Sequence, residues 1–148
     1  MASQQHVLII GAGICGLAIA QGLQKAQIHF SIFEAASESI SNAKDWNMAL
    51  HWSLPVLEGL LPDHLAARLK GIATINPNED AVANRMISIF DGVSGQMMKK
   101  AVIPEPFMRI SRVKLRALCA EGLHVKVKAT IVSMILTDQT RLLSTVRP

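Results

Sequence analysis

Cysteine is scarce in this sequence, and the two cysteines stand far apart. Cys15 and Cys119 are the only two in 148 residues. This spacing fits neither a dense disulfide framework nor a cysteine-based metal motif. We therefore expect no metal site, and we expect a reducing, cytoplasmic setting.

Long apolar stretches are also lacking. No run reaches the roughly 18 uninterrupted apolar residues that a membrane-spanning helix needs, so no membrane partner is expected. The apolar start, residues 7–20, is broken by three glycines, and no Lys or Arg precedes Lys25. A secretory signal would have a basic segment first and a continuous apolar helix after it, so secretion is not expected.

Dense basic runs are missing too, although the net charge is +4. The Lys and Arg residues are scattered, and no aromatic side chains alternate with them. Proteins that bind single-stranded nucleic acid combine both features, so no nucleic-acid partner is expected. Half of the residues are hydrophobic and 18% are charged, which is typical of one globular domain.

The first 34 residues have the pattern of a β-α-β unit. Residues 6–10 form a short branched apolar run, residues 13–25 place apolar side chains at helical spacing, and residues 28–33 are again strand-like. Two strands joined in this way are parallel and connected by a right-handed crossover. The sequence therefore predicts an α/β fold with a Rossmann-like start.

A glycine-rich motif lies at the turn between the first strand and the helix. In such a motif the first glycine allows a tight turn, the second admits a pyrophosphate close to the backbone, and the third brings the helix close to the sheet. The helix N-terminus then faces the phosphates. The predicted cofactor-binding residues of this segment are Gly11, Ala12, Gly13, Ile14, Cys15 and Gly16. For the thiol of Cys15 itself we expect packing rather than reactivity.

Glu34 ends the second predicted strand, 18 residues after Gly16 in the sequence. An acidic residue at about this separation from such a motif accepts hydrogen bonds from the adenosine ribose. Ala35 and Ala36 follow it, and no Arg is present there to neutralise a 2′-phosphate. The pattern therefore disfavours an NADP-type ribose at this site. By itself it does not distinguish FAD from NAD.

The rest of the chain predicts further elements. Residues 46–52 have no regular pattern, and Ser53 is expected to cap a helical region that has Pro55 in its first turn, is interrupted by Pro62 and closes at Gly71. Residues 86–90 and 96–103 predict a β-hairpin, and Ser111 is expected to cap a helix that ends near Gly122. Two strands are expected at 124–127 and 131–136, and residues 137–148 show no clear period.

Three segments together resemble the aromatic-hydroxylase family of FAD-dependent flavoprotein monooxygenases, and its fungal members in particular. These segments are residues 7–34, residues 45–52 (DWNMALHW) and residues 111–118 (SRVKLRAL). The resemblance implies FAD as cofactor and NAD(P)H as reductant. It also implies that Arg112 contacts FAD and that Ala49 lies near the flavin.

The same resemblance implies the organisation of the chain. Residues 1–148 would be the amino-terminal part of an FAD/NAD(P)-binding domain, incomplete, with a hairpin at about 84–104 that begins the substrate domain and a poorly matched tail at 138–148. The Asp-Gly and Gly-Asp motifs that follow later in the family are absent here, since Asp91-Gly92 lies in the predicted hairpin, before the helix that carries Arg112. A partner chain that supplies them is therefore one expectation, and an inactive truncated product is another.

The expected function is oxygenation of a small-molecule substrate, in fungal secondary metabolism as the resemblance implies. The cofactor would carry the chemistry while the protein binds and orients, so no catalytic residue is predicted. Two alternatives stay open at this point. One is an NAD-dependent oxidoreductase, and the other is a non-catalytic nucleotide-binding protein.

Overall fold

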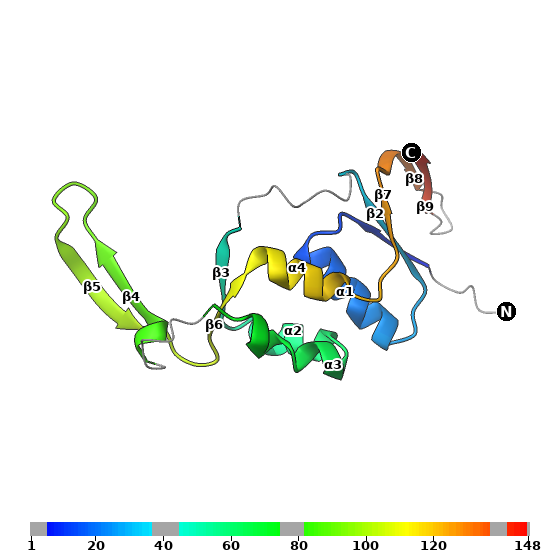
Figure 1. Cartoon of the computed structure of the whole chain (residues 1–148). Coiled ribbons are helices and arrows are strands. Elements are labelled where there is room, and N and C mark those ends of the chain that lie inside the picture. The colour runs from blue at the N-terminus through cyan, green and yellow to red at the C-terminus, as the bar shows by residue number, and fades with distance from the viewer. Residues whose placement is uncertain (1–5, 37–44, 75–81, 137–141, 148) are drawn as a thin grey trace.

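A computed structural model describes residues 6–36, 45–74, 82–136 and 142–147 (Figure 1). The chain begins with β1 (Val7–Ile10), α1 (Ile14–Lys25) and β2 (Phe30–Glu34). Strands β1 and β2 are parallel, with Val7 opposite Phe30 and Ile10 opposite Phe33. The predicted β-α-β unit is confirmed, and Glu34 ends its second strand.

A third parallel strand, β7 (Val125–Val127), pairs with β2 and completes a sheet of order β1-β2-β7. It follows α4 (Arg112–Ala120) directly in the chain. Helices α1 and α4 lie side by side on one face of this sheet (Figure 1). The α/β fold with a Rossmann-like start is therefore present.

The core lies between this sheet and the helices. Ile9 and Ile32 contribute from the strands, Leu17 from α1, and Leu115 and Leu118 from α4, and all five are buried. Gly22 allows the close approach of the next helical segment, because a Cβ there would lie 2.6 Å from a methyl carbon of Leu60.

That segment contains α2 (Leu54–Leu60), α3 (Asp63–Ala66) and a 3₁₀ turn, Leu69–Ile72. Pro55 lies in the first turn of α2, as predicted. The prediction that Ser53 caps the helix is wrong, because its backbone is already helical and its side chain makes no capping hydrogen bond. A capping side chain requires an extended backbone at that residue. Gly71 lies inside the 3₁₀ turn rather than after it.

Residues 46–52 are not wholly irregular as predicted, because they contain β3 (Asn47–Leu50). This strand pairs antiparallel with β6 (Met108–Ser111), which lies some sixty residues later in the chain. Unlike β1, which has the same length, it contains no β-branched or aromatic residue, so its sequence NMAL lacks a strand signal. Its hydrogen bonds come from a distant partner, so the local sequence does not predict it.

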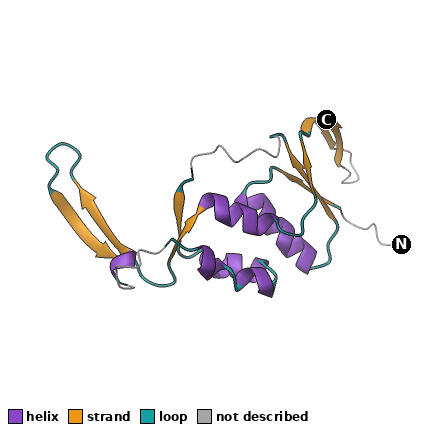
Figure 2. Ribbon diagram, viewed as in Figure 1, coloured by secondary structure: helices purple, strands orange, loops and turns teal. Residues whose placement is uncertain are grey.

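The predicted hairpin is confirmed as β4 (Met86–Phe90) and β5 (Met97–Val102). The Asp91 carboxylate accepts hydrogen bonds from the backbone N–H groups of Val93 and Ser94 and so orders the connecting loop. The two-stranded ribbon extends away from the helices and the parallel sheet (Figure 2).

The last two strands, β8 (Thr130–Leu136) and β9 (Leu142–Arg147), form an antiparallel pair. Strand β8 agrees with the prediction, whereas β9 falls in the tail for which no period was found. The hydrogen bonds of β9 are made to β8 and not within its own segment. In the described part of the chain, no helix is long and apolar enough to cross a membrane.

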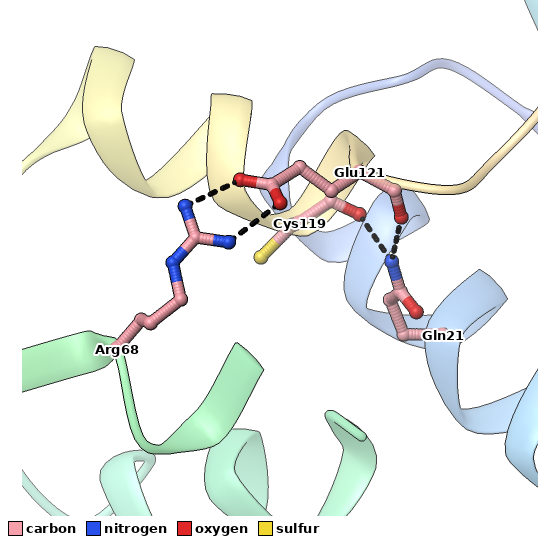
Figure 3. A network of polar contacts seen from close by, with 4 residues as sticks. All are labelled: Gln21, Arg68, Cys119 and Glu121. Carbon is pink, nitrogen blue, oxygen red and sulfur yellow. Dashed lines mark hydrogen bonds and ion pairs between the residues drawn. The ribbon is translucent and has the colours of Figure 1, made fainter. Parts of the chain in front are cut away.

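Gln21 joins α1 to the end of α4 through a buried polar contact (Figure 3). Its Nε2 donates to the carbonyl oxygens of Cys119, at 2.9 Å, and Glu121, at 2.8 Å. The last carbonyls of a helix have no partner within the helix, so this side chain satisfies two of them. On the outer side, Arg68 forms a bidentate ion pair with the Glu121 carboxylate.

Replacing Gln21 with methionine should lower the free energy of unfolding by about 1–3 kcal/mol, because it leaves these carbonyls without a donor in a buried place. Methionine has a similar length, so no large cavity confuses the result. Urea unfolding followed by circular dichroism measures the loss. Arg68→Ala is the matched control and should cost less, because that ion pair is exposed. Equal losses in the two variants would contradict this account.

Candidate functional site at the glycine loop

The glycine loop, residues 11–13, connects β1 to α1 and leaves the strand in a conformation that favours glycine. Gly11 has φ of +97°, in the region that side chains other than glycine rarely adopt. Its N–H donates to the Phe33 carbonyl oxygen at 2.7 Å. The loop is therefore fixed to β2 at the point where β1 ends.

Gly16 lies against this loop. A Cβ at position 16 would lie 2.2 Å from the Gly11 carbonyl oxygen and 3.2 Å from a methyl carbon of Ile9. Only a residue without a side chain allows the first turn of α1 to approach both the loop and β1 so closely.

Gly13 occupies the N-cap position of α1 and has different surroundings. Its backbone is extended, no side chain caps the helix there, and a Cβ at position 13 would meet no atom within 4 Å. The first intrahelical hydrogen bond runs from the Leu17 N–H to the Gly13 carbonyl. The preceding N–H groups at the positive end of α1 therefore remain available to an anion.

The Glu34 carboxylate lies next to this loop. Its Oε2 accepts from the Ala12 N–H at 2.8 Å, and its Oε1 accepts from the Ala36 N–H at 3.0 Å. These hydrogen bonds, from Ala36 first and then Ala12, lower the pKa of Glu34, and the positive charge of Arg116 lowers it further. Glu34 is therefore ionised at neutral pH and oriented, while remaining partly exposed.

Helix α4 contributes a residue that the sequence analysis missed. The Arg116 Nε donates to the Ala12 carbonyl oxygen at 2.7 Å, so α4 is joined directly to the glycine loop. A hint was present in the motif SRVKLRAL, since Arg116 follows Arg112 at the spacing that puts two side chains on one side of a helix.

Arg112, predicted to contact FAD, lies one turn before Arg116 on that same side of α4. Its side chain is exposed, and among the described residues it makes no hydrogen bond or ion pair. Its guanidinium group therefore has no partner among the described residues. Ala49, the other residue expected near the flavin, lies on β3 opposite Arg109. Ala49 takes no part in the hydrogen bonds that connect the glycine loop with β2 and α4.

The expectation that the Cys15 side chain packs in the interior is wrong, because this thiol is exposed. The buried positions of α1 are Leu17, Ala18, Ala20 and Gln21, and Cys15 in the first turn is not among them. The other cysteine, Cys119, is buried, and its burial raises the pKa of the thiol to about 11. Within the ranges that the structure describes, no cluster of His, Cys, Asp or Glu could hold a metal ion.

Comparison with known proteins agrees with this geometry. Residues 9–56 match the family model described as an NAD(P)-binding Rossmann-like domain. FAD-dependent monooxygenase phnB of Penicillium herquei is 39% identical over 135 residues, which are 91% of this chain and 32% of that protein. FAD-dependent monooxygenase dbaB of Emericella nidulans is 33% identical over 135 residues, 90% of this chain and 33% of the relative. The chain thus spans about a third of the length of these curated relatives.

Solved structures show the same fold. The crystal structure of CtdE with FAD and a substrate superposes with a TM-score of 0.71 at 16% identity, covering 97% of this chain and 36% of that one. The substrate-free rebeccamycin biosynthetic enzyme RebC gives a TM-score of 0.69 at 17% identity, covering 95% and 28%. By sequence, the chain is similar to the amino-terminal part of fungal FAD-dependent monooxygenases, and it shares its fold with these solved structures.

Proposed function

We propose that this chain binds the adenosine diphosphate half of FAD and serves an FAD-dependent monooxygenase that acts on a small organic molecule. The observation that carries the proposal is the placement of Glu34. Its ionised carboxylate lies beside the loop from which α1 begins. A ribose acceptor and a helix N-terminus therefore meet at one point, as an adenosine diphosphate group requires.

The residues present fit such a group. The open space at Gly13 lets a pyrophosphate approach the backbone, and the free N–H groups of α1 can donate to its oxygens. The partly exposed Glu34 carboxylate can accept from the ribose hydroxyls. Arg112, whose guanidinium has no partner in the described ranges, can pair with the phosphates. Of the motif, Ile14, Cys15 and Gly16 would contribute backbone N–H groups, whereas the N–H and the carbonyl of Ala12 are bound to Glu34 and Arg116.

When bound, FAD would supply the redox chemistry, with NAD(P)H as reductant and dioxygen as the source of the oxygen atom transferred to the substrate. The residues of this chain would bind and orient the cofactor. Ala49 on β3 would lie near the flavin, as the resemblance suggests.

The contacts described above concern the adenosine end of the cofactor only. Because the chain spans about a third of its relatives' length, we propose that the ring end of FAD is completed by residues outside these 148, such as those of a partner chain. The 148 residues alone should then hold FAD weakly and should not catalyse NAD(P)H-dependent oxygen consumption above that of free flavin.

The match to an NAD(P)-binding model favours one other candidate, a nicotinamide-dependent oxidoreductase. Such an enzyme would use the same loop and Glu34. FAD and NAD share the adenosine diphosphate half, so the two candidates are separated by the absorption spectrum of the protein purified together with the residues that complete the ring end. Our proposal expects flavin bands there, and a nicotinamide-dependent enzyme would show none.

Replacing Glu34 with glutamine should weaken adenosine binding by about 1–3 kcal/mol, the range for a charge-assisted hydrogen bond to a ribose hydroxyl. The amide oxygen can still accept from the Ala12 N–H, so the loop should remain in place. Calorimetric titration with adenosine and with ADP measures the effect. Glu58→Gln on α2 is the matched control and should bind as the wild type does. If both variants bind adenosine equally well, Glu34 is not the ribose acceptor.

A further inference from the structure

We propose that Asp45 is a positioning residue that holds Arg112 in place for the phosphates of the bound nucleotide. The inference rests on the function proposed above. Asp45 Oδ2 accepts from the Ser111 hydroxyl at 2.6 Å, and its Oδ1 accepts from the Val113 N–H at 3.3 Å. Ser111 and Val113 are the two residues on either side of Arg112.

The start of α4 is therefore capped by two residues acting together. Ser111 is the N-cap, and its hydroxyl oxygen accepts from the Lys114 N–H at 3.1 Å while it donates to Asp45. Ser111 is buried, and Asp45 lies on the outer side of it. Two N–H groups that the helix itself cannot satisfy thus have acceptors, and a negative charge stands at the positive end of the helix.

The neighbouring residue Trp46 completes this arrangement. Its carbonyl oxygen accepts from the Arg112 N–H at 2.9 Å. The N-cap Ser111 and the first two residues of α4 are therefore bound to residues 45 and 46, which fixes the backbone from which the Arg112 side chain extends. One turn later, Arg116 binds the Ala12 carbonyl. Arg112 thus lies between two contacts of α4, one to residues 45 and 46 just before β3 and one to the glycine loop.

These contacts stabilise the negative charge of Asp45. The Ser111 hydroxyl first, and then the Val113 N–H and the charge of Lys114, lower the pKa of Asp45. The carboxylate is therefore ionised at neutral pH, and both of its oxygens are occupied by Ser111 and Val113. It does not neutralise the Arg112 guanidinium, which stays available for a phosphate.

Calorimetric titration of the full chain with two probes, ADP and adenosine, tests this role. Arg112 is proposed to bind the phosphates, which ADP has and adenosine lacks. Asp45→Ala should therefore lower the affinity for ADP by about three- to tenfold and leave the affinity for adenosine unchanged. Arg112→Ala should lower ADP affinity at least as much. The double variant should lose no more than Arg112→Ala alone, because Asp45 acts through Arg112. Asp63→Ala, an exposed acidic residue on α3, is the matched control and should change neither affinity.

The outcomes separate the two proposals. If the wild-type chain binds neither probe, the proposed function fails and this inference fails with it. If the wild type binds both and Asp45→Ala binds ADP equally well, only the inference is overturned. The inference is also overturned if Asp45→Ala loses affinity for adenosine and ADP equally, or if the losses of ADP affinity add up in the double variant. Asp45 would then support the fold in general. Should Asp45→Ala not fold, Asp45→Asn is subject to the same expectations.

Discussion

Gly16→Ala should destabilise the chain more than alanine at either of the other two glycines of the motif, Gly11 and Gly13. The added Cβ would lie 2.2 Å from the Gly11 carbonyl oxygen, which is a backbone atom and cannot rotate away. The loop itself is held by the Gly11 hydrogen bond to Phe33 and the Ala12 hydrogen bond to Glu34. Overpacking of this kind costs about 1–3 kcal/mol or more, and we expect the upper end.

Urea unfolding followed by far-ultraviolet circular dichroism measures that loss. A domain of this size is stable by only about 5–15 kcal/mol, so the shift in midpoint should be large. Gly13→Ala is the matched control in the same loop. Position 13 has φ of −72° and open space, so alanine should be tolerated there, at a cost below about 1 kcal/mol for the less favourable N-cap residue. A Gly16→Ala variant as stable as the wild type would mean that the helix does not pack on the loop as described.

Gly13→Val should abolish binding of an adenine dinucleotide while the protein remains folded. Nothing within the described residues opposes a side chain at this position, and the extended backbone there suits valine. The branched side chain would, however, fill the space through which the pyrophosphate reaches the N–H groups of α1. The loss of affinity for ADP should be roughly a hundredfold or more, about 3 kcal/mol.

Gly13→Ala makes this test graded, because its single methyl group should reduce ADP affinity less than valine does. Circular dichroism confirms that each variant is folded before titration. A folded Gly13→Val protein that binds ADP as tightly as the wild type would show that the phosphates do not lie at the start of α1.

The parts of the fold that the sequence predicts are those made by local interactions. The β1-α1-β2 unit, the β4-β5 hairpin and the Ser111 cap each depend on residues close together in the chain. Strands β3 and β9 were missed because neither segment shows a clear strand pattern and each makes its hydrogen bonds to another strand. Ser53 was predicted as a cap from its residue type alone, and its helical backbone rules out that role.

The candidate site divides in the same way. The glycine motif and Glu34 are recognisable because their spacing follows from one β-α-β unit. The contacts that join α4 to them could not be predicted, since Arg116 meets Ala12 across 104 residues and Asp45 meets Ser111 across 66. The packing predicted for Cys15 was wrong, because the exposure of this thiol depends on which side of α1 faces the sheet and not on its place in the motif.

The most direct test of the central claim is a calorimetric titration of the purified 148-residue chain with ADP, repeated in the presence of FAD or FMN. The account predicts that ADP binds at one site, that FAD competes with it, and that FMN, which lacks the adenosine half, does not. Absence of ADP binding by the folded chain, or displacement of ADP by FMN, would contradict the assignment of the glycine loop and Glu34 as the adenosine diphosphate site.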